Sequence, residues 1–195
     1  MTIQLLVAFA LGYLLGSIPF GVVLIRLAGR GDVRKVGSGN IGATNVLRAG
    51  GKGLAAATLV LDALKGAAAV LLARHFWPGS EAFAAAGALI GHLYPVWLRF
   101  RGGKGVATFL GLLIPLFPLG ALVYAIVWLA ALAASRISSV AGILAAVSAP
   151  VTAAIFGGDR LFPMLLGFAL LVVWRHHENI ARLRAGAEPR VGSAK

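Results

Sequence analysis

Residues 37–53 combine the residue types that bind anions in proteins. Glycines lie at Gly37, Gly39 and Gly42, and glycine lets backbone N–H groups approach a ligand closely. The same stretch carries short polar side chains and two cations, namely Ser38, Asn40, Thr44, Asn45, Arg48 and Lys52. An apolar run begins at Leu54, so the stretch leads into a helix N-terminus. These features predict an anion site with phosphate as its ligand; the alternative is a solvated basic loop beside a membrane helix.

The tetrapeptide Gly-Gly-Lys-Gly occurs twice, at 50–53 and at 102–105, each time just before an apolar run. The second copy consists of Gly102, Gly103, Lys104 and Gly105, and Thr108 follows it. The second copy does not match a P-loop, because Leu98 and Gly105 stand where that motif needs glycine and a hydroxyl side chain. It can still bind phosphate through N–H groups, the helix end and Lys104. The recurrence favours anion binding over a merely solvated loop.

Three ionisable residues lie inside apolar segments. Asp62 and Lys65 are three residues apart and share one helix face, and His92 lies about two turns before the end of the next expected helix. Ionisable groups at such depth are costly unless they pair or line a polar cavity. Asp62 and Lys65 form either a structural ion pair or a support that orients the cations of the anion site. His92 either bonds across helices or takes part in ligand binding or proton transfer.

A polar cluster closes the last apolar segment, with Arg175, His176, His177, Glu178 and Asn179 in succession. His176 and Asn179 are three apart and can share a helical face. The cluster serves either as an interfacial anchor or as part of the anion site. Its spacing lacks the i, i+4 histidine pair of a helical zinc site, so we expect no metal and no other cofactor.

Composition places the chain in a membrane. Of its 195 residues, 59% are hydrophobic and 12% are charged, and the mean hydropathy is +0.91, which excludes an ordinary soluble domain. No cysteine is present, so disulfides and thiolate nucleophiles are excluded. The net charge of +12 lies in short loops between apolar segments, which favours anionic lipids and anionic substrates over nucleic acid.

The apolar pattern predicts an all-α polytopic membrane protein with one membrane-embedded domain over 1–195. We expect the first segment, at 3–27, to be a retained helix that is kinked near Pro19. Residues 28–53 are then a polar loop and the tail from Arg175 is polar. The other segments are expected at 54–76, 82–98, 106–114, 119–135, 138–156 and 161–174.

The short segment at 106–114 decides the number of crossings. About nine residues span too little length to cross a hydrocarbon core of about 30 Å as one regular helix, so it either joins the next segment, giving six crossings, or crosses alone, giving seven. With seven crossings and a cytoplasmic loop at 28–53, 15 of the 18 lysines and arginines are cytoplasmic. The positive-inside rule therefore favours seven transmembrane helices, one of them short, with the N-terminus outside and the C-terminus in the cytoplasm.

The full set of motifs resembles the bacterial membrane glycerol-3-phosphate acyltransferases that use acyl-phosphate as donor. The matching segments follow the family's order and span nearly the whole chain: 16–21, 37–45 with Arg48, Asp62 with 65–66, Gly91 and His92 with Pro95, Phe100 with 102–108, and 175–176 with Asn179 and 182–183. The resemblance implies a seven-helix fold in the bacterial cytoplasmic (inner) membrane, with the active site facing the cytoplasm. It implies acyl transfer from acyl-phosphate to the 1-hydroxyl of glycerol 3-phosphate, giving lysophosphatidic acid and phosphate, without a metal.

On this reading the sequence assigns three groups of site residues. Catalysis is expected of Ser38, Asn40, His92, Lys104, His176 and Asn179; substrate binding of Gly37, Gly39, Gly42, Thr44, Asn45, Arg48, Lys52, Gly102, Gly103, Gly105 and Thr108; and support of the site of Asp62 and Lys65. We expect residues of 37–44 to hold the acyl-phosphate head and Arg48, Lys104, His176 and Asn179 to hold glycerol 3-phosphate, with the acyl chain in an apolar groove open to lipid.

Several alternatives remain open at this point. Carboxylates are scarce on the expected cytoplasmic face, so the proton acceptor is His92, His176 or a phosphate oxygen of the donor, and a Ser38 nucleophile activated by His92 is a rival mechanism. An organophosphate transporter would use the same anion site, but such proteins usually show internal repeats. A structural protein that binds anionic lipid leaves the polar motifs unexplained. A monomer is compatible with the sequence, which carries no signal for a particular oligomeric state.

Overall fold

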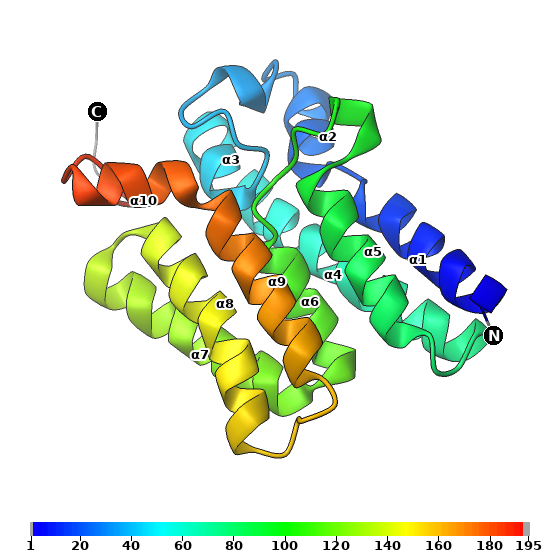
Figure 1. The fold of residues 1–195 in the computed structure, drawn as a ribbon. Coiled ribbons are helices and arrows are strands. Elements are labelled where there is room, and N and C mark those ends of the chain that lie inside the picture. Colours follow the sequence, from blue (N-terminus) through cyan, green and yellow to red (C-terminus); the bar gives the residue numbers. More distant parts are fainter. Residues whose placement is uncertain (1, 193–195) are drawn as a thin grey trace. The chain divides into compact units, whose positions relative to one another are not determined.

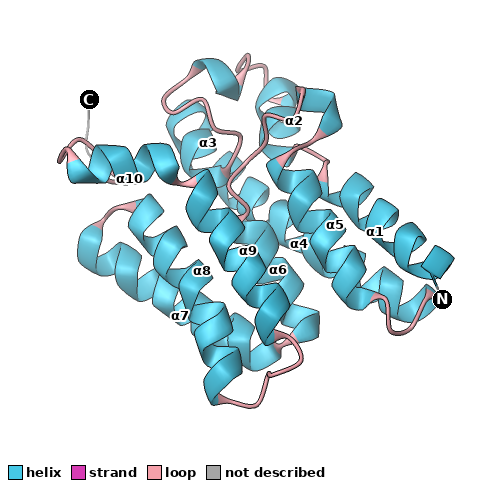
Figure 2. Ribbon diagram, viewed as in Figure 1, coloured by secondary structure: helices cyan, strands magenta, loops and turns pink. Residues whose placement is uncertain are grey.

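The computed structural model describes residues 2–192, and every regular element within that range is a helix (Figures 1 and 2). The all-α prediction is therefore confirmed. The chain divides into two compact units, Met1–Leu116 and Phe117–Lys195. The first contains α1 (Thr2–Gly16), α2 (Phe20–Leu27), the 3₁₀ turn η1 (Val33–Lys35), α3 (Ala43–Gly50), α4 (Lys52–Phe76), α5 (Glu81–Leu93), the 3₁₀ turn η2 (Val96–Leu98) and α6 (Val106–Leu116). The second contains α7 (Pro118–Ser135), α8 (Ser138–Ile155), α9 (Phe162–Arg175) and α10 (His177–Arg184).

Four helical segments within the described range are long and apolar enough to cross a membrane, namely Thr2–Leu27, Lys52–Phe76, Pro118–Ser135 and Ser138–Ile155. Two shorter apolar helices, Val106–Leu116 and Phe162–Arg175, accompany them. The segment that sequence placed at 106–114 ends at Leu116 and is separated from α7 by Phe117. The count of seven crossings and the orientation of the termini stay predictions.

Helix α4 is the central element of the first unit, since it contacts each of the five other α-helices there. The most extensive pairing in this unit joins α1 to α5, which lie side by side in Figure 1. A Cβ at Gly12 or Gly16 would overlap the carbonyl groups of Ala84 or Ala88. Small residues of this kind let apolar helices approach closely, which is the usual way helices pack in membranes.

The first apolar segment is broken as predicted. Helix α1 ends at Gly16 and α2 begins at Phe20, with Pro19 between them. Proline has no N–H and disturbs the backbone hydrogen bonds of the preceding turn. The Lys65 ammonium of α4 donates a hydrogen bond to the Ile18 carbonyl at 2.8 Å, so a buried side chain supplies a partner at the break.

Two expected elements differ in the structure. The helix expected over 82–98 ends at Leu93, because the residue before Pro95 is disfavoured in helical conformation; His92 is therefore in its last turn. The loop expected over 28–53 contains η1 and α3. The tail is polar as expected, and it contains α10, which follows α9 after His176.

An apolar cluster binds the polar segments of the first unit together. Its buried members come from α2, η1, α3, η2 and the intervening loop: Val22, Ile25, Val33, Ile41, Val46 and Leu98. Ile41 lies within the first Gly-rich stretch, and Leu98 precedes the second by a few residues. The cluster therefore holds both Gly-rich loops near one apolar core.

Candidate functional site

The first Gly-rich loop, 37–42, leads into α3 and not into the apolar helix expected to follow it. Gly37 and Gly39 have φ values of 56° and 68°, a left-handed conformation that glycine adopts at little cost. Gly42 is the N-cap of α3. The helix N-terminus expected at the end of the 37–53 stretch is that of α4, which begins at Lys52, and α3 is an additional eight-residue helix inside the expected loop.

Asn45 in the first turn of α3 organises this loop. Its amide nitrogen donates to the carbonyls of Val33, Val36 and Asn40 at 2.8–2.9 Å, and its Oδ1 accepts from the Ser38 N–H at 3.2 Å. Asn45 is 2% exposed. Both polar atoms of the Asn45 side chain bond the backbone of the loop. We therefore infer that Asn45 holds the loop in place, whereas the sequence predicted that it contacts substrate.

The other polar side chains of this region divide into structural and accessible groups. Asn40 accepts a hydrogen bond from the Gly42 N–H at 2.9 Å, so it forms a local turn just before α3. Ser38, Arg48 and Lys52 are exposed, and a side chain at Gly37 would meet the Arg48 Cδ at 3.3 Å. The Arg48 side chain thus lies against the loop, with its Nη1 3.7 Å from the same position. Thr44 is half-buried in the first turn of α3.

The second Gly-rich loop folds back on the end of α5. Gly102 N–H donates to the Leu93 carbonyl at 3.1 Å, and Gly103 N–H donates to the His92 carbonyl at 3.0 Å. A Cβ at Gly102 would overlap the His92 carbonyl oxygen, and one at Gly103 would overlap the His92 imidazole. These two glycines therefore allow close packing against the end of α5. Their N–H groups, which we expected to bind phosphate, donate to carbonyls of that helix end instead.

The rest of the second loop presents a cation at a helix start. Arg99 and Phe100, with φ values of 52° and 61°, reverse the chain after η2. Lys104 follows, half-buried. Gly105 has φ 87°, and its carbonyl accepts from the Phe109 N–H at 2.7 Å as α6 begins. Thr108 is fully buried in the first turn of α6, so we expect it to pack and not to touch substrate.

The three ionisable residues predicted inside apolar segments come together. Lys65 Nζ lies 2.6 Å from Asp62 Oδ1, and His92 Nδ1 lies 3.7 Å from the same oxygen. All three residues are at most 4% exposed. The distance from His92 Nδ1 to Asp62 Oδ1 exceeds that of a hydrogen bond, so the imidazole lies beside the ion pair. The predicted pairing of Asp62 with Lys65 is present, and His92 adjoins it.

In the second unit, His176 and Asn179 are both buried at the α9–α10 junction, 2% and 5% exposed. His176 Nδ1 contacts the Val172 carbonyl at 2.7 Å; as the carbonyl only accepts, this contact places the proton on Nδ1. The Asn179 amide donates to the Glu188 carboxylate. His176 is the C-cap of α9 and the N-cap of α10, and both side chains bond protein groups of their own unit.

Glu188 is the residue that sequence reasoning missed. Its carboxylate accepts from Ser139 Oγ and Arg182 Nε, both at 2.7 Å, in addition to Asn179. Burial by itself would raise the pKa of Glu188, but these hydrogen bonds and the Arg182 charge outweigh it and lower that pKa. Its position could have pointed to this role, because Glu188 is the only acidic residue among the arginines of 182–190. Glu188 ties the tail to α8 and α10.

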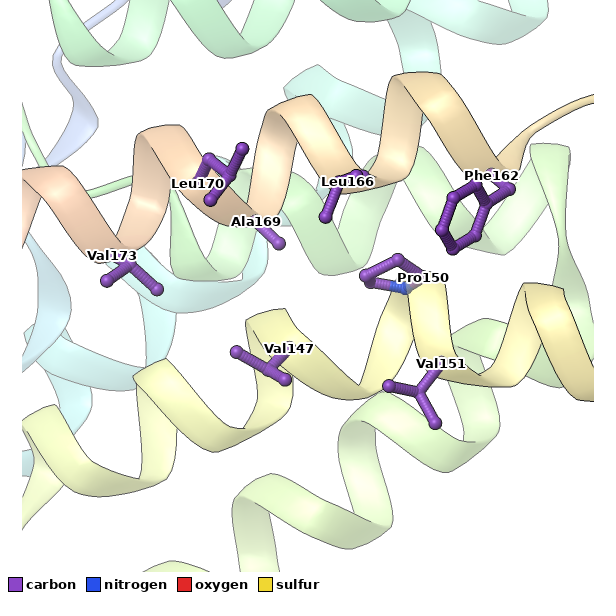
Figure 3. A pocket seen from close by; sticks show the side chains of 8 residues that line it. All are labelled: Val147, Pro150, Val151, Phe162, Leu166, Ala169, Leu170 and Val173. Carbon is purple, nitrogen blue, oxygen red and sulfur yellow. The ribbon is translucent and has the colours of Figure 1, made fainter.

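The second unit also contains an apolar groove between α8 and α9 (Figure 3). Its volume is about 380 Å³. The lining is entirely apolar and consists of Val147, Pro150, Val151, Phe162, Leu166, Ala169, Leu170 and Val173. Such a groove accepts a hydrocarbon chain and offers nothing to a polar ligand.

Comparisons with known proteins agree over nearly the whole chain. The model of the glycerol-3-phosphate acyltransferase family matches residues 6–186. Glycerol-3-phosphate acyltransferases from Mesorhizobium japonicum and Rhodopseudomonas palustris are each 54% identical, over 99% and 96% of this chain and the same shares of theirs. Two crystal structures of PlsY, an integral membrane glycerol 3-phosphate acyltransferase, match with TM-scores of 0.91 and 0.89 and identities of 41% and 39%. Each alignment covers 96% of this chain and 95–96% of the other; one structure is the glycerol 3-phosphate form and the other the lysophosphatidic acid form.

Proposed function

The chain belongs to the glycerol-3-phosphate acyltransferase family, and on that premise we propose that it moves a fatty acyl group from acyl-phosphate to the 1-hydroxyl of glycerol 3-phosphate. The hydroxyl oxygen attacks the acyl carbonyl carbon, the bond from that carbon to the phosphate oxygen breaks, and the hydroxyl proton leaves with the phosphate. The products are lysophosphatidic acid and inorganic phosphate. This is the first acylation step of phospholipid synthesis.

One observation carries the proposal: two cation-bearing Gly-rich loops adjoin one apolar cluster in the first unit. Arg48 and Lys52 belong to the first loop region and Lys104 to the second. Both substrates bring a phosphate, so a site for this reaction needs two anion-binding elements. We assign the acyl-phosphate head to Ser38, Thr44 and the 37–42 loop, and glycerol 3-phosphate to Arg48 and Lys104. Cations placed there also stabilise charge on the reacting carbonyl and the leaving phosphate.

The donor assignment rests on the reactivity of the donor and on the surroundings of His92. An acyl-phosphate is already activated, so its reaction needs no strong base. His92 is 4% exposed, and its ring faces Asp62 and Gly103. This environment supports a phosphate oxygen of the donor as proton acceptor, in preference to His92. It also weakens the alternative of a Ser38 nucleophile activated by His92.

Two further parts of the proposal concern the second unit taken by itself. The binding of glycerol 3-phosphate by His176 and Asn179 stays a prediction, and within this unit the Glu188 carboxylate accepts a hydrogen bond from the Asn179 amide. The acyl chain requires an apolar groove open to lipid, and the α8–α9 groove is the candidate in this unit (Figure 3). Phe162 and Pro150 line it, so larger or smaller residues there are expected to change the preferred chain length.

The protein is an integral membrane protein, as its apolar helices and its solved relatives indicate. We propose seven crossings in the bacterial cytoplasmic membrane, with the N-terminus outside and the loops at 28–53 and 99–105 inside. The excess of lysine and arginine in those loops supports this orientation. Both Gly-rich loops then face the cytoplasm, where glycerol 3-phosphate is available.

The test is phosphate release by the purified protein in detergent, supplied with palmitoyl-phosphate and glycerol 3-phosphate. Release that requires both substrates, yields lysophosphatidic acid and fails with acyl-CoA is the expected result. Activity with acyl-CoA would overturn the donor assignment. Glycerol 3-phosphate binding without turnover on either donor would favour transport. Arg48→Ala should lose activity, whereas Arg160→Ala, at an exposed arginine between α8 and α9, serves as the matched loss of charge.

A further inference from the structure

Helix α4 carries an ion pair in the middle of an apolar segment, 2% and 4% exposed at the Lys65 and Asp62 side chains. Burying two charges costs several kcal/mol per ion, and an apolar pair of similar volume is often as stable or more so. Stability alone therefore does not explain why the central helix of the first unit contains Asp62 and Lys65. Lys65 contacts residues that adjoin the loop at 37–42, and Asp62 contacts a residue that adjoins the loop at 102–105.

The Lys65 side chain leads to the first loop. Its ammonium donates to the Ile18 carbonyl at 2.8 Å and lies 5.7 Å from the centroid of the Phe20 ring, so it holds the start of α2. One residue on, a Cβ at Gly21 would overlap the Ile41 carbonyl. The backbone of loop 37–42 therefore rests directly on the turn of α2 that Lys65 fixes.

The Asp62 side chain leads to the second loop. Its Oδ1 faces His92 Nδ1 at 3.7 Å, and the opposite edge of the same imidazole packs against Gly103 without room for a methyl group. The Gly103 N–H also bonds the His92 carbonyl. The orientation of one buried ring thus limits where the backbone beside Lys104 can lie.

We propose that Asp62 and Lys65 are positioning residues for acyl transfer, which fix the two Gly-rich loops relative to each other through Ile18 and His92. This inference rests on the proposed function, because it assumes that both loops bind substrate phosphates. It assigns neither residue a contact with substrate. Displacement of a phosphate-binding loop by about 1 Å can cost roughly 100-fold in rate, so a small relaxation of the pair should slow turnover strongly.

The decisive variant is Asp62→Asn with Lys65→Met, which removes both charges and leaves no unpaired ion. A pair that serves only charge balance predicts wild-type kcat for this double variant. If the pair positions the loops, the double variant should unfold at a thermal midpoint close to that of wild type, and its kcat should be roughly 100-fold lower. Its KM for glycerol 3-phosphate should change much less than its kcat. Glu81→Gln is the matched control, because the half-buried Glu81 makes a 3.8 Å ion pair with the exposed Arg74 at the other end of α5 from His92.

A distance measurement tests the same inference without turnover. The chain has no cysteine, so Lys35→Cys and Arg101→Cys place spin labels on two exposed positions, each close to one loop. In full-length protein, the distance distribution between the labels should shift or broaden when the double variant is introduced. An unchanged distribution together with wild-type kcat would overturn the inference. This readout remains valid if the donor proves not to be acyl-phosphate, which separates the two proposals.

Lys65→Arg is the variant to use if the double variant does not fold. It keeps the positive charge beside Asp62, but a planar guanidinium does not reproduce the ammonium geometry at the Ile18 carbonyl. The same shift in label distance and a lower kcat are expected. A Lys65→Arg protein with wild-type distance distribution and wild-type rate would contradict the positioning role.

Discussion

The two Gly-rich loops of the first unit, 37–42 and 102–105, use glycine for different physical reasons. In loop 37–42, Gly37 and Gly39 supply left-handed backbone, and the Asn45 amide gathers the surrounding carbonyls. In loop 102–105, Gly102 and Gly103 supply close contact, and the carbonyls at the end of α5 take up their amide hydrogens. One loop is ordered by a side chain, and the other by packing against a helix end.

The comparison shows why a glycine motif does not by itself identify phosphate-binding amides. Glycine is needed both where φ is positive and where a Cβ has no space. In loop 102–105 the second reason applies, and the N–H groups of Gly102 and Gly103 are bonded to the carbonyls of Leu93 and His92. We therefore expect substrate recognition at the second loop to depend on Lys104 more than on the amides of Gly102 and Gly103.

The largest effect is expected from Gly102→Ala. The added Cβ would overlap the His92 carbonyl oxygen and approach Pro95, and backbone atoms cannot move aside as a side chain can. The loop must shift, so activity should fall by roughly 100-fold or more, as measured by phosphate release. Gly53→Ala is the matched control in the first Gly-Gly-Lys-Gly copy: it lies in α4 with no atom within 4 Å of its Cβ. It should keep wild-type activity; equal losses at both glycines would contradict the packing explanation.

A smaller effect is expected from Asn45→Asp, which tests the side-chain ordering of the first loop. A carboxylate keeps the size of the amide but has no N–H to donate to Val33, Val36 and Asn40. Each buried carbonyl left without its partner costs about 1–3 kcal/mol. The thermal midpoint should therefore fall, and the apparent KM for the acyl donor should rise more than that for glycerol 3-phosphate. Unchanged stability would show that water replaces the amide and that Asn45 is dispensable for order.

The smallest effect concerns pH and distinguishes the loops by their charged neighbours. The hydrogen bond from the Arg34 side chain is the main reason that the pKa of Asp32, just before η1, lies well below its ordinary value of 3.8. A lowered pKa in the folded state adds stability above pH 3.8, and this is lost as the pH falls toward the folded-state pKa. The second loop has no acid within 99–105.

Between about pH 4 and pH 2, the free energy of unfolding of Asp32→Asn should therefore fall less than that of wild type. The difference should be below about 1 kcal/mol, as expected of an exposed ion pair. Thermal unfolding of variant and wild type across this range measures it. The difference between the two proteins should shrink with added salt. A variant whose acid limb matches that of wild type would show that the Asp32–Arg34 pair contributes nothing to loop order.

The sequence alone determined the class of the protein and the position of most helices. Apolar runs of sufficient length, charges confined to short segments, and Pro19 are local features that act wherever the chain folds, so the all-α fold and the break after Gly16 were predictable. The two Gly-rich helix starts and the Asp62–Lys65 pair follow from local spacing as well. The family resemblance rested on motifs that keep their order along the chain.

Only the tertiary structure decided what each polar group does. Asn45 turned inward because the carbonyls of Val33, Val36 and Asn40 needed donors, and the Asn40 side chain accepts from the Gly42 N–H. Gly102 and Gly103 met α5 because the chain reverses at Arg99 and Phe100. Glu188 gained its role from Ser139, 49 residues away. Residue type and spacing specify which groups can bind an anion, but burial and hydrogen-bond partners arise from contacts distant in sequence, and these decide which groups remain available to do so.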